Sequence, residues 1–425
     1  MRVLSLSYCF PNAAQPSWGV FVAQRLAALS KRIDLEVAAP QACFPLLRPP
    51  ARHDEGDGCM GLNVHRPPFY FVPAILKNLD GGLYARSLRK WMECYCCRRR
   101  PDLLDAHFIW PDGVGVGLLA RRMGLPYVIT LRGKIYDCLT SRSQTRQCGD
   151  ALVGAAAVIS VSGDMAHIAA QWGVPSEKIF VMPNGVDRQA FCLRDRLSCR
   201  RQLNLPQDKH IVLCVGHLKR TKGQAELLWS LRQLSANVHA VLVGGEATRG
   251  YRRQLDDWIR RLGLRDRVTL AGRQSYDRIP LYFNAADVSV LASHREGCPN
   301  VVLESLASGT PVVATDVGAV RDLMVPGRDG EIIPPRDFRL LAQALERVLS
   351  KTWQGELLRQ SPAVRSWDDV AADVHAVFQR VVNGTMALSS ARPQEMAQAD
   401  YNKPRERSFI SESVRGRYVN RNVMS

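Results

Sequence analysis

The chain has 425 residues, of which 46% are hydrophobic and 23% charged, and its formal net charge is +17 at pH 7. This length is too great for one ordinary core, and the composition excludes a disordered chain, so two globular domains are expected. No secretory leader precedes the strand predicted from Arg2, and no apolar run approaches the ~20 residues of a spanning helix. We therefore expect a cytoplasmic protein.

The excess of basic residues is spread along the chain and favours an anionic partner. A phosphate-bearing substrate, an anionic membrane surface and nucleic acid all fit this charge, and simple solubility explains it as well. The 12 cysteines mostly stand alone, as in a reducing compartment. The cluster of Cys94, Cys96 and Cys97 lacks the paired spacing of a zinc site, so no metal site is predicted.

The first half of the chain alternates strands and helices. Residues 2–6 and 35–38 are predicted strands, and Val22, Leu26 and Leu29 recur on one face of a helix between them. Further strands are predicted at 103–108, 127–131, 157–161 and 178–182, with a helix at 114–122 and a loop at 9–19. The chain therefore opens as a series of βαβ units.

Residues 43–80 interrupt this alternation with prolines and aromatic side chains, and a basic helix is predicted around 83–92. Aromatic and basic residues together are typical of a segment that lies against a membrane interface. An irregular loop beside a solvated helix face is the equal alternative. The membrane interpretation gains only if the substrate is a lipid.

The alternation restarts after a polar link at 188–208. Strands are predicted at 210–215, 239–243, 268–270, 287–292 and 311–314, and helices at 225–234, 255–262, 337–349 and 367–382. The repeated pattern predicts an α/β fold of two doubly wound, Rossmann-like domains with parallel sheets that face each other across a cleft. The expected parts are 1–186, 187–365, a helix within 366–383 that crosses back to the first domain, and a disordered tail at 384–425.

One segment between two of these strands is predicted to bind a ligand. Residues 296–304 read EGCPNVVLE, with a loop followed by a helix. Ligands of parallel sheets lie at the carboxyl ends of strands and at helix N-termini. If the helix begins near Asn300, Glu304 lies just over one turn inside it and Glu296 lies in the loop before it. Both carboxylates can then face one crevice and bind a polyol that carries phosphate.

A second loop, residues 216–223, follows the strand at 210–215 and supplies cations. Lys222, with Lys219 and Arg220, is expected to bind a diphosphate, which would make a metal ion unnecessary. The backbone N–H groups of Asn300 and Val301 are expected to bind the same phosphates. Together with Glu304 for a ribose diol and Glu296 for a sugar hydroxyl, this set predicts a nucleotide-sugar.

The second half resembles the retaining glycosyltransferases of family 4, which have the GT-B fold. The resemblance rests on residues 296–304, 309–314, 317–320, 243–245, 286–287 and 183–187, and it extends over residues 1–382. It implies that the second domain binds the donor and the first domain the acceptor. Transfer would take place between them with retention of anomeric configuration. A nucleotide-sugar would be the co-substrate, and no metal cofactor is expected.

The resemblance also assigns roles to individual residues. It implies that Glu296, beside Gly297, contacts the donor sugar and that Glu304 contacts the ribose. Lys222 would contact the diphosphate. Gly19 matches the glycine of the family's first loop, and the last predicted helix would cross back to the first domain.

The chain departs from the family at two positions. His217 stands where the family often has an arginine, so Lys219 or Arg220 is expected to replace that arginine as a diphosphate ligand. Arg132 stands where the family commonly has a histidine near the reacting sugar, and an arginine there can hold a phosphate. His107, at the end of the preceding strand, is a second candidate for catalysis, and a structural role is its other interpretation.

The sequence thus predicts a metal-independent sugar transferase in cell-surface polysaccharide or glycolipid assembly, with a sugar or lipid-linked acceptor. A nucleotide-sugar epimerase of the same fold is the alternative, and it would convert the donor without an acceptor. A basic nucleic-acid-binding protein is a further alternative. Because the basic residues are dispersed and no known nucleic-acid module is recognised, a nucleic acid partner is not expected.

Overall fold

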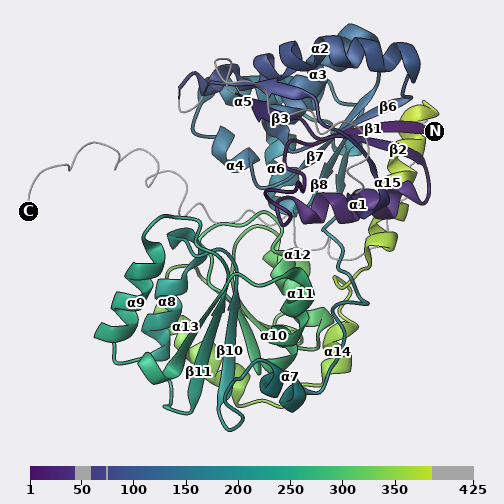
Figure 1. The fold of residues 1–425 in the computed structure, drawn as a ribbon. Helices are drawn as coiled ribbons and strands as arrows, with labels where there is room; N and C mark the ends of the chain where they lie inside the picture. Colours follow the sequence, from purple (N-terminus) through teal and green to yellow (C-terminus); the bar gives the residue numbers. More distant parts are fainter. Residues whose placement is uncertain (44–58, 73–74, 385–425) are drawn as a thin grey trace, which may run out of the picture. The chain divides into compact units, whose positions relative to one another are not determined.

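A computed structural model describes residues 1–43, 59–72 and 75–384 (Figure 1). The predicted tail therefore lies outside the described residues from 385 onward, as do 44–58 and 73–74 of the proline-rich segment. Two parallel sheets organise the described chain, one of seven strands and one of six. This arrangement confirms the α/β class that the alternating pattern predicts.

The first sheet has the strand order β4-β2-β1-β6-β7-β8-β9. Its strands are β1 (Arg2–Leu6), β2 (Asp34–Ala38), β4 (Asn63–His65), β6 (Leu103–His107), β7 (Tyr127–Leu131), β8 (Ala157–Ser160) and β9 (Ile179–Val181). A separate pair is formed by β3 (Gln41–Cys43) and β5 (Pro68–Tyr70). Chain order reverses between β1 and β6, so the connections that follow these two neighbouring strands lead in opposite directions along the sheet.

Helices cover both faces of the first sheet. They are α1 (Val20–Ser30), α2 (Asp80–Arg98), α3 (Val114–Met123), α4 (Ile135–Cys138), α5 (Arg142–Val153) and α6 (Gly163–Gln171). Tyr84 and Leu88 of α2, Leu119 of α3 and Leu152 of α5 share one core with the strands. Helix α1 lies on the other side of the sheet from α2 and α3 (Figure 1).

The second sheet has the order β12-β11-β10-β13-β14-β15, with its reversal between β10 and β13. Its strands are β10 (His210–Val215), β11 (Val238–Val243), β12 (Val268–Gly272), β13 (Val288–Leu291), β14 (Val312–Thr315) and β15 (Gly330–Ile333). Its helices are α7 (Arg196–Gln202), α8 (Gln224–Leu231), α9 (Tyr251–Arg261), α10 (Ile279–Ala285), α11 (Asn300–Ala307), α12 (Val320–Leu323), α13 (Phe338–Leu349) and α14 (Gly355–Arg359). One core lies under α10 and α11, and the other under α8, α9 and α13.

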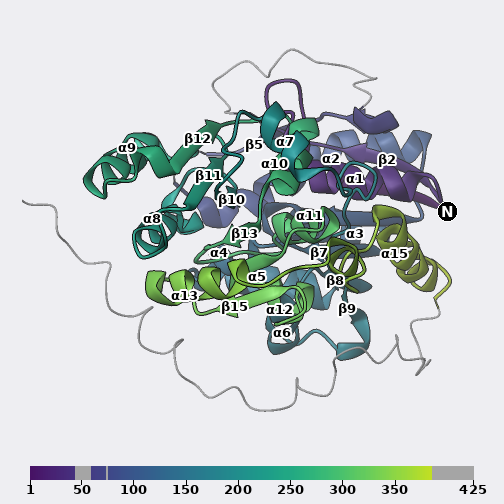
Figure 2. The same cartoon turned by 90° about the horizontal axis from the view of Figure 1, so that it is seen from below.

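The last helix, α15 (Trp367–Val382), returns to the first sheet and packs against α1 (Figures 1 and 2). Ser366 begins it with a capping box, because its side chain accepts from the Asp369 amide and the Asp369 carboxylate accepts from the Ser366 amide. Lys31 at the end of α1 also pairs with Asp368, with 3.0 Å between Nζ and Oδ1. The last described helix thus lies next to α1, the helix that follows the first strand.

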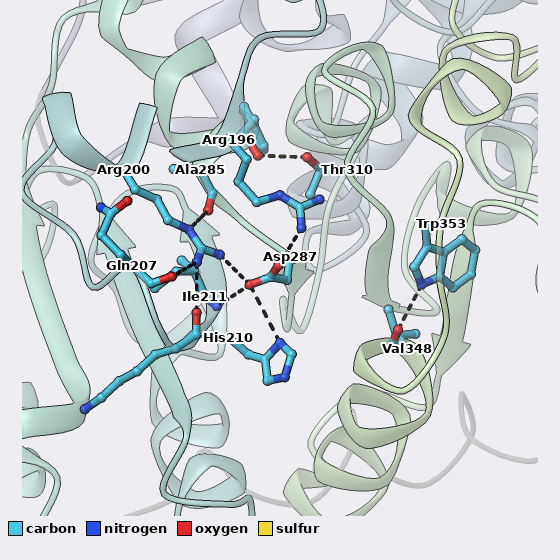
Figure 3. A network of polar contacts seen from close by, with 12 residues as sticks. Arg196, Arg200, Gln207, His210, Ile211, Ala285, Asp287, Thr310, Val348 and Trp353 are labelled. Atoms are coloured by element: carbon cyan, nitrogen blue, oxygen red, sulfur yellow. Dashed lines mark hydrogen bonds and ion pairs between the residues drawn. The ribbon is translucent and has the colours of Figure 1, made fainter. Parts of the chain in front are cut away.

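A buried arginine fastens the start of β10 to the strand beside it (Figure 3). Arg200 of α7 donates from Nη2 to the Asp287 carboxylate at 2.6 Å, from Nε to the Ala285 carbonyl, and from Nη1 to two further carbonyls. Asp287 also accepts from the Ile211 amide at 2.6 Å. Arg200 is only 4% exposed, and every guanidinium nitrogen has an oxygen partner.

Candidate functional site

The loops after β10 and β13 meet where the order of the second sheet reverses, because these two strands are neighbours. Gly223 holds the loops together with a φ of +69°, and a Cβ there would lie 1.9 Å from the Ala292 carbonyl oxygen. Only glycine permits this approach. The residues that the sequence assigned to one site, Lys222 and Glu296, are thereby brought side by side.

Lys222 and Glu296 form an ion pair, with 2.6 Å between Nζ and Oε1. The side chains are 26% and 13% exposed, so solvent and ligand can reach both of them. Ser293 Oγ donates to the same Oε1 at 2.6 Å. The cation and the carboxylate are thus oriented before a ligand arrives. A phosphate can replace Glu296 as the partner of Lys222, and a sugar hydroxyl can replace Lys222 as the partner of Glu296.

Helix α11 begins at Asn300, as the sequence predicts, directly after this loop. Pro299 is its N-cap and provides no side-chain hydrogen bond, so the amides of Asn300 and Val301 lie in an uncapped first turn that favours an anion. Glu304 lies one turn further and is partly buried. Burial raises the pKa of its carboxyl to about 7.

The other residues that the sequence predicts as cationic ligands lie in the same loop as Lys222. Lys219 is half-buried, whereas Arg220 and His217 are exposed. Desolvation of the His217 ring, together with the charge of Lys222, lowers its pKa. A neutral imidazole attracts an anion less than Lys222, Lys219 or Arg220 does.

The first domain contributes Gly19, at the start of α1, and Arg132, directly after β7. Gly19 has a φ of +73° at the start of α1, and a Cβ there would lie 2.2 Å from the Cys9 carbonyl oxygen. Arg132 follows β7 and donates from Nη1 to Asn184 Oδ1 at 2.8 Å. Asn184 Nδ2 donates in turn to Asn300 Oδ1 at 2.8 Å.

This relay connects Arg132 to the first residue of α11. A Cβ at Gly133 would also lie 3.5 Å from the Cα of Gly297. Sequence reasoning did not include Asn184 among the site residues, although it lies in the 183–187 motif that supports the resemblance. For Ser293, the sequence indicated a role in the site only through its position three residues before Glu296.

His107 is fully buried in β6. Its Nε2 lies 3.0 Å from Asp105 Oδ2, and Ser5 Oγ donates to the same oxygen at 2.9 Å. Burial lowers the pKa of His107 to about 4 despite the neighbouring carboxylate. The structure therefore places this imidazole, uncharged, beneath the sheet edge rather than beside Glu296.

Among the described residues there is no group of three or more His, Cys, Asp or Glu side chains that could hold a metal ion. Within the same residues, no helix is long and apolar enough to span a membrane.

Two doubly wound parallel sheets, with cations and carboxylates at the reversal of the second one, define the GT-B class of glycosyltransferases. The comparisons agree with this class. Residues 19–190 match the family model Glycosyltransferase Family 4, and residues 195–363 match the model Glycosyl transferases group 1. The chain is a glycosyltransferase whose first half matches the family 4 model and whose second half matches the group 1 model.

Several known proteins are similar over most of the chain. The Bacillus subtilis glycosyltransferase TuaC, named for teichuronic acid biosynthesis, is 28% identical over 89% of this chain and 95% of its own length. The D-inositol 3-phosphate glycosyltransferase of Acidothermus cellulolyticus is also 28% identical, over 65% of this chain and 67% of its own.

Solved structures share the fold at lower identity. Sucrose-phosphate synthase from Thermosynechococcus elongatus superposes with a TM-score of 0.76 at 22% identity, over 90% of this chain and all (100%) of its own. Anabaena HepE in complex with UDP-glucose gives a TM-score of 0.66 at 21% identity, over 91% of this chain and 100% of its own.

Proposed function

We propose that this glycosyltransferase moves a sugar from a UDP-sugar to an acceptor, with retention of anomeric configuration, in the assembly of a cell-surface polysaccharide or glycolipid. The observation that carries the proposal is the Lys222–Glu296 pair at the reversal of the second sheet. HepE, of the same fold, was solved in complex with UDP-glucose, which supports the donor, and TuaC is named for teichuronic acid biosynthesis, which supports the pathway.

The site residues divide the donor between them. Lys222 stabilises the departing diphosphate, aided by the first turn of α11, and this cation makes a metal ion unnecessary. Glu296 exchanges its lysine partner for hydroxyls of the transferred sugar. Glu304, once ionised, accepts from the ribose diol. Retention follows from the family resemblance rather than from any distance in the site.

The donor is tested by calorimetric titration of UDP, GDP and ADP and of the corresponding glucose conjugates. We expect UDP and UDP-glucose to bind, and Lys222→Met to weaken both. Binding of GDP or ADP alone would overturn the choice of base. Incubation with UDP-glucose alone separates transfer from epimerisation, because an epimerase forms a second UDP-sugar without acceptor.

The acceptor is proposed to be held at an anionic membrane through α2 and the segment before it. Ile75, Leu76 and Leu79 are 62%, 58% and 52% exposed, which places three large apolar side chains in solvent. The exposed Arg86 and Lys90 of α2 share one helix face, since they lie four residues apart. Apolar and basic groups together favour an anionic interface and a lipid-linked acceptor.

Flotation with phosphatidylglycerol vesicles and with neutral phosphatidylcholine vesicles tests this surface. We expect binding to the anionic vesicles only, and loss of binding in the double variant Arg86→Glu, Lys90→Glu. The matched control is Arg121→Glu, an exposed arginine on α3. Equal flotation of the double variant and the control would refute the membrane role of α2.

A further inference from the structure

Two arginine side chains lie buried at the carboxyl edge of the first sheet. Arg25 of α1 is 2% exposed and Arg132 after β7 is 3% exposed. Arg132 stacks over the Phe21 ring, with 4.8 Å from its guanidinium carbon to the ring centroid. The two guanidinium groups repel each other electrostatically, and Asp105 attracts both.

The same edge of each guanidinium group lacks a partner. Nε and Nη2 of Arg25, and Nε and Nη2 of Arg132, are buried without a hydrogen-bond acceptor among the described residues. Nε and Nη2 form the side-on edge of the planar group, which binds a carboxylate or a phosphate through two parallel hydrogen bonds. Leaving such donors unpaired costs about 1–3 kcal/mol each, so a missing acceptor is indicated.

The charges of the cluster do not balance. Burial and the charge of Arg25 lower the pKa of Arg132 to about 9, so it stays protonated at neutral pH. His107 is neutral, since burial lowers its pKa to about 4. In this cluster of described residues, Asp105 then supplies one negative charge, whereas Arg25 and Arg132 supply two positive charges. The nearby buried Asp112 adds none, because burial raises its pKa to about 8.

The cluster adjoins the loop proposed to contact the transferred sugar. Arg132 reaches Asn300 through Asn184, with 2.8 Å for each of the two hydrogen bonds. Gly133 lies against Gly297, the neighbour of Glu296. An anion bound at the free edge of Arg132 is thus close to the point of transfer.

We infer that Arg132, with Arg25 beside it, binds an anionic group carried by one of the two substrates, a carboxylate or a phosphate next to the point of transfer. This inference rests on the proposed function, because it assumes that the sugar is transferred beside Glu296. It makes Arg132 a residue that selects charged substrates, and Arg25 a second donor to the same anion. A histidine at this position cannot donate two parallel hydrogen bonds to one anion.

The donor as the source of the anion is tested with a matched pair. UDP-glucuronic acid and UDP-glucose differ by one carboxylate, and calorimetry gives the affinity of wild type and Arg132→Met for each and for UDP. If the donor sugar carries the anion, wild type prefers UDP-glucuronic acid by about tenfold or more, and Arg132→Met abolishes the preference. Weaker binding of UDP itself by the variant would assign the anion to the diphosphate.

The acceptor as the source is tested with glucose 1-phosphate and glucose at saturating UDP. A larger thermal stabilisation by the phosphate in wild type, lost in Arg132→Met, assigns the anion to the acceptor. Arg121→Met is the control for loss of a positive charge elsewhere on the first domain, and Arg132→Lys retains the charge without the two-pronged edge. Urea unfolding confirms that each variant is folded.

The outcomes are distinct. If Arg132→Met changes none of these affinities or stabilisations more than Arg121→Met does, Arg132 is a structural residue and the inference is wrong. If wild type binds no UDP-sugar, the proposed donor fails first and this inference falls with it. If wild type binds UDP-glucose and Arg132→Met behaves like Arg121→Met in every assay, this inference is wrong while the proposed function stands.

Discussion

Two buried arginine sites in this chain differ in how their hydrogen bonds are satisfied. Arg200, at the base of the second sheet, directs every nitrogen to an oxygen and pairs with the ionic partner Asp287 (Figure 3). Arg132, at the carboxyl edge of the first sheet, has one hydrogen bond and two buried nitrogens without an acceptor. A buried charge whose hydrogen bonds are satisfied can join parts of the scaffold, whereas a buried charge with unpaired donors is costly, which fits the anion binding inferred for Arg132.

The largest expected effect tests this difference directly. Arg200→Met removes one of the two arginines that pair with the partly buried Asp287, together with the hydrogen bonds of Arg200 to three backbone carbonyls. We expect it to lower the free energy of unfolding by about 3–5 kcal/mol. Arg132→Met removes a charge that is already poorly satisfied, so we expect less than half of that loss. Urea unfolding of both variants gives the comparison, and equal losses would contradict it.

The next effect concerns chemistry rather than stability. Glu296→Gln keeps the shape of the side chain but removes the charge that Lys222 and Ser293 orient, and we expect kcat to fall by about 100–1000-fold. Initial rates of transfer measure it, with Glu346→Gln on the exposed face of α13 as the control. Near-normal rates in Glu296→Gln would remove Glu296 from the catalytic site.

Lys222→Met should weaken UDP binding by about 1–3 kcal/mol, through one lost charged hydrogen bond to the diphosphate. The affinity for uridine, which has no phosphate, should not change. Calorimetry with both ligands measures the two effects. A parallel loss for uridine would mean that the variant disturbs the loop after β10 rather than a phosphate contact.

The smallest effect is a pH dependence. With its pKa raised to about 7, the Glu304 carboxyl of the free protein is mostly protonated at pH 6 and mostly ionised at pH 8. Only the ionised form accepts both hydrogen bonds of a ribose diol, so UDP affinity should rise with pH across this window, by up to about tenfold. Glu304→Gln should flatten this rise, and an identical slope in the variant would show that Glu304 is not its cause.

Much of the fold was predictable because its signals are local. Apolar runs locate the strands, and Asp337 and Ser366 accept from backbone amides at the starts of two predicted helices. The sequence analysis missed α5, whose side chains are mainly polar, and β15, which is short and ends just before Pro334. Neither element has the apolar periodicity on which the prediction depends.

The sequence predicted single residues of the site but not the contacts between them. Lys222 and Glu296 each lie in a recognisable loop, but their ion pair joins residues 74 positions apart and depends on strand order. The relay through Asn184 depends on contacts between distant segments in the same way. Arg25 did leave a signal, because it lies three residues after Val22 and four before Leu29, on the apolar face of α1.

The return of α15 to α1 sets the order in which the protein can be completed on the ribosome. Val374, Val377 and Phe378 are buried in this helix, which packs against a helix made more than 330 residues earlier. Helix α1 therefore lacks this packing partner until the whole second sheet has been synthesised. The first domain of a nascent chain is complete only once α15 has left the ribosome.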